Sequence, residues 1–409
     1  MSDLIVMKFG GTSVADPDKI QRAADRAIAQ RRAGRRVVVV VSAPGEMTDE
    51  LIALARRVAP DPDSRELDML MATGEQVGIS LFAIACRARG VPAVSLTGPQ
   101  AGILADATHT KARIVEIRPR KVHEELARGN IVTVAGFQGL NPSRDIATLG
   151  RGGSDLTAVA LAASLGAKHC EIYTDVHGVY TADPRMVPDA RLIPRISYDE
   201  MLELAGAGAQ VMQGRSIEVA KKFGVPIRVA HAFDARSTGT WITGEVSSME
   251  EAVVTGVAFD RNQVKVTIRD VPDKPGMAAD IFGAMGKANV NVDMIIQSAA
   301  HGAINDISFT VHKDDHDAAI KVLEQVQRRL KAGSIEHNVN VSKVSVVGVG
   351  MRSHAGVAGR MFRTLADNGV NIDMIATSEI KISCIIERKD GERAVRCLHK
   401  AFRLEKRRA

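Results

Sequence analysis

The feature that most constrains the fold is a repeat in the carboxyl-terminal third of the chain. Residues 273–282 match residues 353–362, and residues 290–295 match residues 370–375, so the offset is 80 residues in both cases. Each copy reads as a strand, a glycine turn, an amphipathic helix, two strands and a helix. Two copies at so long a period indicate a duplicated compact domain rather than a solenoid of short stacked units.

The repeat therefore predicts two small βαββαβ units, which bury one face of a sheet under helices and often pair side by side. We place the first unit at residues 262–335 and the second at residues 342–409. The small and polar stretch 239–248 precedes them and marks a domain boundary.

The first 245 residues alternate strand-like and helix-like patterns, which predicts an α/β domain with a mostly parallel sheet sandwiched by helices. Residues 37–41 are all valine, as is typical of a strand buried on both faces. We assign residues 1–245 to this domain. The other expected strands are 4–9, 131–137, 170–174 and 226–230, and the expected helices are 17–32, 72–89, 154–165 and 216–223.

Composition indicates an ordinary globular protein, with 45% hydrophobic and 25% charged residues. Aromatic residues make up only 3%, which argues against recognition by base stacking. The net charge of +6 comes from short basic runs interspersed with acidic residues. We interpret these runs as solvated surface and expect no nucleic-acid partner.

No segment of the sequence predicts secretion or membrane insertion. The first residues lack the basic and apolar regions of a signal peptide, and no run approaches the ~18 apolar residues of a membrane span. The four cysteines have no metal-ligand spacing and fit a reducing cytoplasm. His312 and His316 lie in a polar turn without a third ligand, so we expect no protein-built metal site.

The strongest chemical motif is Gly150-Arg151-Gly152-Gly153-Ser154-Asp155, which is followed by an apolar helical pattern. The glycines let backbone N–H groups approach a ligand, and the helix directs its positive end to the same place. Arg151 suits a carboxylate because its guanidinium binds two oxygens at once. Asp155 adds an anion that can orient a cation. The combination favours an acidic small molecule beside a phosphate donor, although Gly-Gly-Ser also forms ordinary turns.

A second motif, Lys8-Phe9-Gly10-Gly11-Thr12-Ser13, ends the first predicted strand. A lysine beside two glycines and two hydroxyls favours phosphate binding, since backbone donors approach closely and the ammonium neutralises charge. The motif is not a Walker loop, because GxxxxGK[ST] is absent.

Two further polar residues follow the next strand. Thr48 lies in the loop after the valine run, where ligands of open α/β sheets collect, and is a candidate substrate contact. Glu75 is expected near the start of a helix. It either binds a substrate ammonium or offsets the helix dipole, and the sequence favours neither reading.

The segment Thr174-Asp175 ends another predicted strand and leads through a glycine turn to Tyr180 and Arg185. These residue types suit a nucleotide base, ribose and phosphates, although an ordinary loop has the same composition.

Taken together, these motifs and the duplicated unit closely resemble the aspartate kinases (aspartokinases) of the amino-acid kinase family, over residues 3–403. Thr377-Ser-Glu-Ile-Lys-Ile-Ser383 in the second copy strengthens the resemblance. The resemblance implies a carbamate kinase-like α/β domain followed by two ferredoxin-like ACT regulatory domains. It also implies that ATP and Mg²⁺ are used to convert L-aspartate to 4-phospho-L-aspartate, the first step toward lysine, threonine and methionine.

The resemblance also implies roles for individual residues. Catalysis falls to Lys8 and Asp155. Aspartate is held by Thr48, Glu75, Arg151, Gly152, Gly153 and Ser154. The nucleotide is held by Lys8, Gly10, Gly11, Ser13, Thr174, Asp175, Tyr180 and Arg185. A carboxylate nucleophile, with a pKa of about 3.9, needs no general base, and these motifs contain no histidine.

In the regulatory half, the resemblance implies effector contacts around the turn after each first strand and the start of the next strand. These are Met277, Ala279, Asn291, Asp293, Gln297, Val357, Ala358 and Asn371. The implied effectors are lysine, threonine or both. The implied assembly is a homo-oligomer, or an α2β2 enzyme whose regulatory subunit starts at Met249.

One position departs from the family pattern: Gln210 stands where many relatives have a lysine that contacts the nucleotide. A neutral amide supplies no charge to phosphate. Two alternatives to an aspartate kinase remain, and Gln210 bears on the second of them. The first is a kinase for another acid, such as glutamate, acetylglutamate or carbamate, and the second is a catalytically inactive amino-acid sensor.

Overall fold

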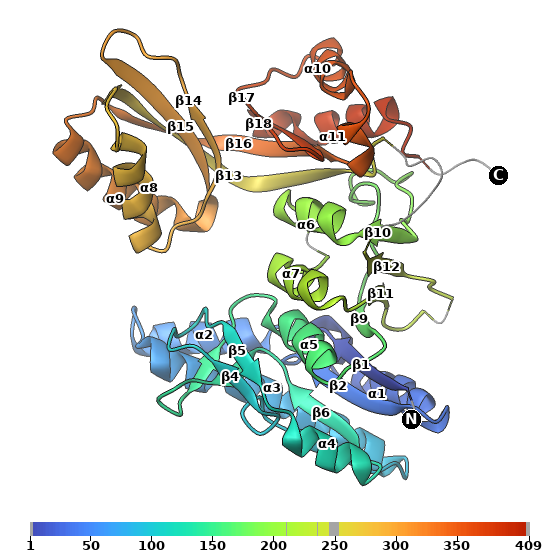
Figure 1. The fold of residues 1–409 in the computed structure, drawn as a ribbon. Helices are drawn as coiled ribbons and strands as arrows, with labels where there is room; N and C mark the ends of the chain where they lie inside the picture. Colours follow the sequence, from blue (N-terminus) through green and yellow to red (C-terminus); the bar gives the residue numbers. More distant parts are fainter. Residues whose placement is uncertain (1–2, 210, 235, 245–252, 406–409) are drawn as a thin grey trace. The chain divides into compact units, whose positions relative to one another are not determined.

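The computed structural model describes residues 3–209, 211–234, 236–244 and 253–405. The chain divides into two compact units (Figure 1). The first contains residues 1–179, 192–205 and 210–247, and the second contains residues 180–191, 206–209 and 248–409. Gln210 and Met249 lie outside the described residues.

The first unit is built on an eight-stranded sheet in the order β10-β12-β11-β9-β1-β2-β6-β3. The strands from β11 to β3 are parallel to one another, whereas β12 is antiparallel to β11 and parallel to β10. The predicted mostly parallel sheet is therefore confirmed. The strands are β1 (Leu4–Phe9), β2 (Arg36–Val41), β3 (Ala93–Leu96), β6 (Ile131–Ala135), β9 (Cys170–Thr174), β10 (Arg195–Ser197), β11 (Ile227–His231) and β12 (Thr240–Thr243).

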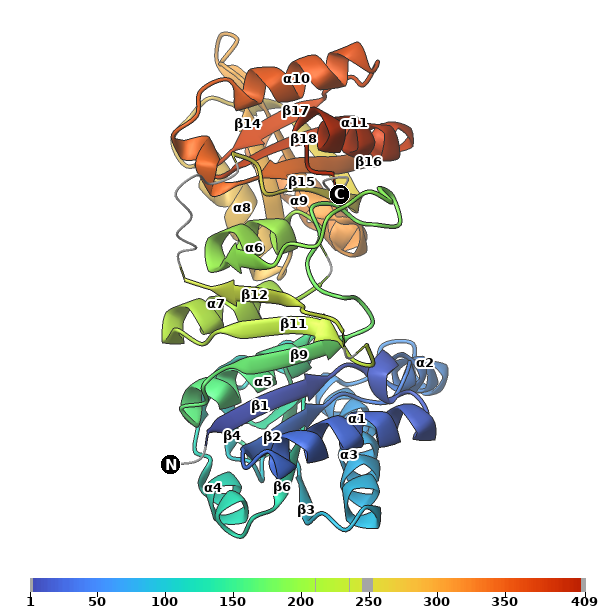
Figure 2. The ribbon, with the colours of Figure 1, turned by 90° about the vertical axis from the view of Figure 1, so that its right-hand side faces the viewer.

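Helices cover both faces of this sheet. Alternate residues of β1 and β2, among them Met7 and Val39, join a core with α1 (Pro17–Arg32) and α3 (Ser64–Ala88), which Figure 2 shows on the same side. On the other face, α5 (Gly153–Ser164) packs against β1, β2 and β9. Ten of its twelve residues are buried, which explains its apolar sequence. The remaining helices are α2 (Met47–Val58), α4 (Arg120–Ala127), α6 (Tyr198–Gly206) and α7 (Gly214–Phe223).

A second, four-stranded sheet in the first unit is absent from the sequence-based prediction. Its order is β5-β4-β7-β8, and β8 leads directly into the Gly150 loop. Its strands have only three or four residues, too few to show a period. They are β4 (Ile103–Ala105), β5 (Ile114–Ile117), β7 (Gln138–Leu140) and β8 (Ile146–Thr148).

The two repeats of the second unit share one antiparallel six-stranded sheet, in the order β14-β15-β13-β16-β18-β17. Each copy contributes three strands and two helices. The first copy has β13 (Gly256–Pro272), α8 (Met277–Lys287), β14 (Val292–Gln297), β15 (Ile304–His312) and α9 (His316–Leu330). The second has β16 (Ile335–Val347), α10 (Val357–Asp367), β17 (Met374–Thr377), β18 (Lys381–Glu387) and α11 (Gly391–Ala401).

The fourth strand of each βαββαβ unit comes from the other copy's first strand. The beginning of β16 pairs with residues 265–268 of β13, and so completes the first unit. Residues 256–260 of β13 pair with residues 343–347 of β16, and so complete the second. The two units are thus interleaved as well as adjacent.

Among the helices of the described residues, α3 is long and apolar enough to cross a membrane by length and composition, contrary to the sequence-based expectation that no segment comes close. More than half of its most apolar stretch is buried inside the first unit. We interpret α3 as a core helix.

Candidate active site

The carboxyl ends of β1, β2, β6 and β9 meet at one edge of the large sheet because these strands are parallel. Lys8 and Gly10 lie at the end of β1, and the N–H of Gly10 donates to the carbonyl of Tyr173 at the end of β9 (3.3 Å). The motifs that the sequence singled out after these strands therefore lie along a common edge.

Gly11 begins a short 3₁₀ helix that includes Ser13. Only a glycine fits at this position, because the backbone of the loop after β2 approaches it closely. A Cβ at Gly11 would lie 2.8 Å from the carbonyl oxygens of both Ala43 and Gly45. The N–H of Gly45 donates to the carbonyl of Gly11 (3.0 Å), so the loops after β1 and β2 are fixed to each other. Thr48 lies half-buried in the first turn of α2, directly after this contact.

Lys8 and Asp155 form an ion pair. The Nζ of Lys8 lies 2.6 Å from Oδ1 of Asp155, and the two side chains are only 12% and 11% exposed. Asp155 is in the first turn of α5, so the ammonium is held at the positive end of a helix. A cation kept there is available to an anion that approaches the same helix end.

The Gly150 loop turns sharply into α5. Gly150 and Gly152 have φ angles of 78° and 69°, in the left-handed region that favours glycine. Arg151 between them is exposed, whereas Gly153 and Ser154 are buried. The backbone therefore presents the Arg151 guanidinium to solvent beside the buried first turn of α5.

Glu75 is buried, with 3% of its surface exposed. Its Oε1 accepts a hydrogen bond from the N–H of Ala43 (3.3 Å), and its Oε2 has no hydrogen-bond partner among the described residues. Burial raises the pKa of Glu75 to about 7. Glu75 lies well inside α3, which begins at Ser64, so the helix-dipole reading is wrong. The unpaired oxygen is what a ligand ammonium would satisfy.

Two helix glycines bring Glu75 to this edge. A Cβ at Gly74 would lie 2.8 Å from Cβ of Ala43, and a Cβ at Gly78 would lie 2.6 Å from the carbonyl of Ser42. The helix α3 consequently lies directly against the segment that follows β2.

Thr174 and Asp175 follow β9 at the same edge, and the Thr174 hydroxyl donates to Oδ1 of Asp175 (3.0 Å). Tyr180 and Arg185 belong to the second compact unit. There Tyr180 packs against the hydrophobic core, and Arg185 binds Asp183 through its Nε and Nη2 atoms.

Sequence reasoning missed two residues that shape this edge. Gly136 follows β6, and a Cβ there would lie 2.5 Å from the Ser154 hydroxyl. Gln213 packs over Gly152: a Cβ added at Gly152 would lie 2.6 Å from the Cβ of Gln213. The Oε1 of Gln213 is buried without a hydrogen-bond partner in the described part of the chain. A glycine directly after a buried strand was a signal for Gly136, whereas Gln213 had none.

The predicted effector contacts lie at different ends of the second unit's sheet. Met277 begins α8. Gln297 is the last residue of β14 and pairs with Ile307 of β15. Ile307 also pairs with Ile268, near the end of β13. Ala279 is in the first turn of α8. Asn291 precedes the start of β14, a strand length away from that turn. In the second copy, Val357 and Ala358 open α10, and Asn371 precedes β17.

Two lysines tie the copies together. Lys343 of β16 is only 2% exposed; its Nζ forms an ion pair with Asp293 and donates to the carbonyl of Gly206 (3.0 Å). Lys265 of β13 binds Asp373 (2.7 Å). In each case a lysine from the first strand of one copy reaches the Asn-x-Asp-Met aspartate of the other.

Family models match most of the chain. The amino acid kinase family model matches residues 3–231, and ACT domain models match residues 266–330 and 344–402. The aspartokinase of Pseudomonas aeruginosa is 52% identical over 404 residues, which cover 98% of each chain. The chain belongs to the aspartokinases of the amino acid kinase family.

Other aspartokinases agree with this placement. Aspartokinase 2 of Bacillus subtilis is 49% identical over 403 residues, which cover 98% of each chain. The structure of Escherichia coli aspartokinase III with aspartate and ADP (R-state) is 26% identical, has a TM-score of 0.86, and the match covers 98% of this chain and 99% of that one. The same enzyme with lysine and aspartate (T-state) gives a TM-score of 0.74. As an aspartokinase, the chain is an ATP-using kinase with ACT domains, and the predicted family, fold class and enzyme activity are confirmed.

Proposed function

We propose that the edge described above transfers the γ-phosphoryl group of ATP to the side-chain carboxylate of L-aspartate and forms 4-phospho-L-aspartate. The observation that carries the proposal is the Lys8–Asp155 ion pair at the first turn of α5. Phosphoryl transfer depends on positioning and on neutralising the equatorial oxygens, which this ammonium and the α5 N–H groups supply. The acceptor carboxylate is ionised at neutral pH, so the step needs no general base.

Aspartate would be held by opposite charges at its two ends. The Arg151 guanidinium would bind the α-carboxylate through two hydrogen bonds. The unpaired Oε2 of Glu75 would accept from the α-ammonium. Ser154 at the start of α5, Gly152 and Gly153 through their N–H groups, and Thr48 would complete the contacts.

The nucleotide would lie against the loop after β1. Lys8, the backbone of Gly10 and Gly11, and Ser13 would contact the phosphates. Thr174 and Asp175 at the end of β9 would contact the nucleoside. We also assign nucleotide contacts to Tyr180 and Arg185, on the basis of the family motif alone.

Mg²⁺ would be bound chiefly by the ATP phosphates and water. The described residues contain no group of three or more metal-ligating side chains, and Mg²⁺ typically needs only one or two protein carboxylates beside phosphate oxygens. Asp155 and Asp175 are the carboxylates at this edge that fit. The ion would neutralise charge on the transferred group.

We further propose that lysine, threonine or both inhibit the enzyme through the ACT domains, and that the reaction opens lysine, threonine and methionine synthesis in the cytoplasm. The support is the match to Escherichia coli aspartokinase III with lysine (T-state). The effector contacts would be those predicted from the sequence. The assembly would be a homo-oligomer, or an α2β2 enzyme with a subunit started at Met249.

The Lys8→Met variant tests the catalytic assignment, with acyl phosphate trapped by hydroxylamine. We expect kcat to fall about 10²–10³-fold, as for other losses of a transition-state charge donor, with the KM for aspartate within about twofold of wild type. Lys19→Met, which removes an exposed ion pair with Asp16, is the control and should keep full activity. An unchanged kcat in Lys8→Met would overturn the assignment.

A further inference from the structure

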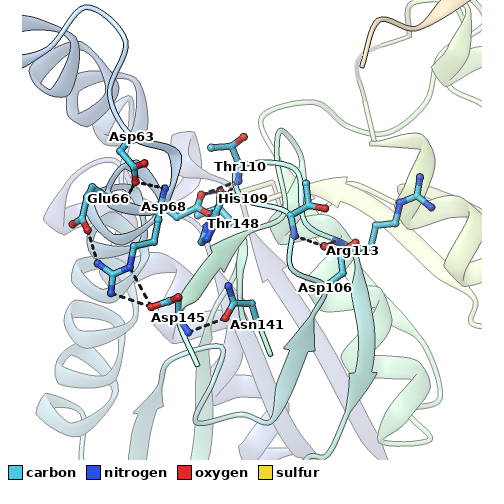
Figure 3. Close-up of polar contacts among 12 residues, drawn as sticks. Asp63, Glu66, Asp68, Asp106, His109, Thr110, Arg113, Asn141, Asp145 and Thr148 are labelled. Carbon is cyan, nitrogen blue, oxygen red and sulfur yellow. Dashed lines mark hydrogen bonds and ion pairs between the residues drawn. The ribbon is translucent and has the colours of Figure 1, made fainter. Parts of the chain in front are cut away.

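We propose that Asp68 is a positioning residue for aspartate binding, which acts by fixing the backbone that leads into Arg151. The inference rests on the proposed role of Arg151. It concerns a buried carboxylate (Figure 3), which precedes Glu75 on the same helix by about two helical turns.

Asp68 is fully buried, and its carboxylate is surrounded by donors. Oδ1 accepts from the Thr148 hydroxyl, both oxygens accept from the N–H of Thr110 (3.1 Å each), and Oδ2 lies 2.7 Å from Nδ1 of His109. A buried carboxylate is costly unless its oxygens are satisfied, and here several donors converge on it. His109 and Thr110 lie in the loop between β4 and β5, and Thr148 ends β8, so the donors come from two segments distant in sequence, as Figure 3 shows.

Thr110 gives independent evidence that this contact restrains the backbone. Its φ is 63°, a left-handed conformation that is strained for a β-branched residue. Such a conformation persists only where the surroundings hold it, and the bond to both oxygens of Asp68 does so. The carbonyl of Thr110 in turn lies against Gly150, where a Cβ would be 3.3 Å away.

The second segment, which ends β8, leads directly into the Arg151 site. Thr148 is the last residue of β8, and its carbonyl accepts from the N–H of Ala112 (2.9 Å). The Arg215 guanidinium then bridges the carbonyls of Leu149 (2.8 Å) and Ala112 (2.9 Å). The backbone is thus fixed up to Leu149.

Beyond Leu149, Arg151 lies in a turn closed by the N–H of Gly153, which donates to the carbonyl of Gly150 (2.9 Å), so the turn moves together with the segment that leads into it. The position of the guanidinium consequently depends on how well residues 148–149 are held. The helix that holds them also carries Glu75. A single rigid element would therefore set the spacing between the groups that receive the α-carboxylate and the α-ammonium of aspartate.

The test is steady-state kinetics of the full-length chain carrying Asp68→Asn, which keeps the shape but turns one acceptor into a donor. We expect the KM for aspartate to rise about tenfold, the KM for ATP to stay within twofold, and kcat to change less than the aspartate KM. Thr148→Val should move the aspartate KM in the same direction, and Thr148→Ser, which keeps the hydroxyl, should restore it. If Asp68→Asn does not fold, the Thr148 pair carries the test.

The matched control is Asp145→Asn. Asp145 binds Arg65 of the same helix from the turn before β8, so the variant loosens the same two elements without touching Asp68. It should leave the aspartate KM unchanged. An equal rise in this control, or an equal rise in the KM for ATP, would show a merely structural role and overturn the proposal.

A double-mutant cycle tests whether Asp68 acts through Arg151. In an Arg151→Ala background, Asp68→Asn should raise the aspartate KM less than twofold further, because the group it positions is gone. The same factor in both backgrounds would contradict the proposal. Wild-type turnover is measured first: its absence overturns the proposed function, whereas normal wild-type turnover with an unchanged KM in Asp68→Asn overturns only this inference.

Discussion

At the scale of single residues, the site is governed by charges placed out of water. Lys8 and Asp155 form an ion pair, whereas Oε2 of Glu75 has no hydrogen-bond partner in the described part of the chain. Because burial raises the pKa of Glu75 from 4.5 to about 7, the folded chain binds this proton more tightly than the unfolded chain does. Its contribution to stability therefore falls as the pH rises from about 4.5 to 7. In the proposed site, this loss of stability accompanies an ionised Glu75 carboxylate that can bind the substrate ammonium.

This pKa predicts the pH dependence of aspartate binding. An aspartate ammonium needs ionised Glu75, so the KM for aspartate should rise close to tenfold per pH unit as the pH falls below about 7. The Glu75→Gln variant should have a high aspartate KM that is flat between pH 6 and 8. Initial rates at each pH measure this, with the KM for ATP as the internal control. A pH-dependent aspartate KM in Glu75→Gln would assign the titration to another group.

How far the site follows from sequence differs between residues. The motifs that contain Lys8 and Asp155 were both singled out from the sequence as binding phosphate and substrate, whereas the ion pair between the two side chains was not predicted. The burial of Glu75 and its position inside a helix were not predicted, because the first turns of α3 are polar and the sequence pattern did not indicate that this helix begins at Ser64. Asp68 carried no signal at all, since its partners come from a strand and a loop of the small sheet that the sequence did not predict.

At the scale of elements, the arrangement depends on glycines that permit close contact. The predicted elements 4–9, 17–32 and 170–174 coincide with β1, α1 and β9, because their patterns are local. The interleaving of β13 and β16 could not be read from sequence, since it depends on pairing between residues about 80 positions apart. Elements with strong local periods were predictable, and long-range pairing was not.

Gly78 and Gly283 form a matched pair within helices. A Cβ at Gly78 would lie 2.6 Å from the Ser42 carbonyl, whereas one at Gly283 in α8 would meet no atom within 4 Å. Gly78→Ala should destabilise the first unit by about 1–3 kcal/mol and lower activity, because α3 must shift away from β2. Gly283→Ala should stabilise the second unit by up to about 1 kcal/mol. Chemical denaturation measures the free energy of unfolding of both variants. Equal changes in Gly78→Ala and Gly283→Ala would contradict this packing.

The two lysines that link the ACT copies should differ in their contribution to the free energy of unfolding. Lys343→Met removes a buried cation and leaves Asp293 and the Gly206 carbonyl without their donor, so we expect a loss of about 1–3 kcal/mol. Lys265→Met breaks a more exposed pair with Asp373 and should cost less than about 1 kcal/mol. Unfolding of each variant is followed by denaturant titration. A larger loss of unfolding free energy in Lys265→Met than in Lys343→Met would show that burial does not determine which ion pair contributes more to stability.

At the scale of the whole molecule, the chain joins a catalytic domain to a pair of ACT domains that share one sheet. Each ACT copy borrows a strand from the other, so neither copy can rearrange without affecting its neighbour. An effector can shift activity only by binding one state of the enzyme more tightly than another. The shared sheet is suited to such a change, because it couples both copies.

Feedback inhibition is the prediction at this scale. Lysine and threonine together should lower the rate at subsaturating aspartate by about 5–150-fold, the usual range of allosteric coupling. Gln297→Ala should weaken the inhibition and leave the uninhibited rate unchanged. Rates with each amino acid singly and in combination measure this, with methionine as a comparison. Full activity in saturating lysine and threonine would contradict the proposed effectors.

The central claim is that this site phosphorylates the side-chain carboxylate of aspartate. The most direct test is ATP-dependent acyl phosphate formation by the full-length chain, trapped as the hydroxamate, with L-aspartate and L-glutamate compared at equal concentration. We predict hydroxamate from aspartate and almost none from glutamate, because Arg151 and Glu75 would fix the backbone end of the substrate and a longer side chain would overshoot Lys8. Hydroxamate from glutamate at a comparable rate, or from neither acid, would contradict the account.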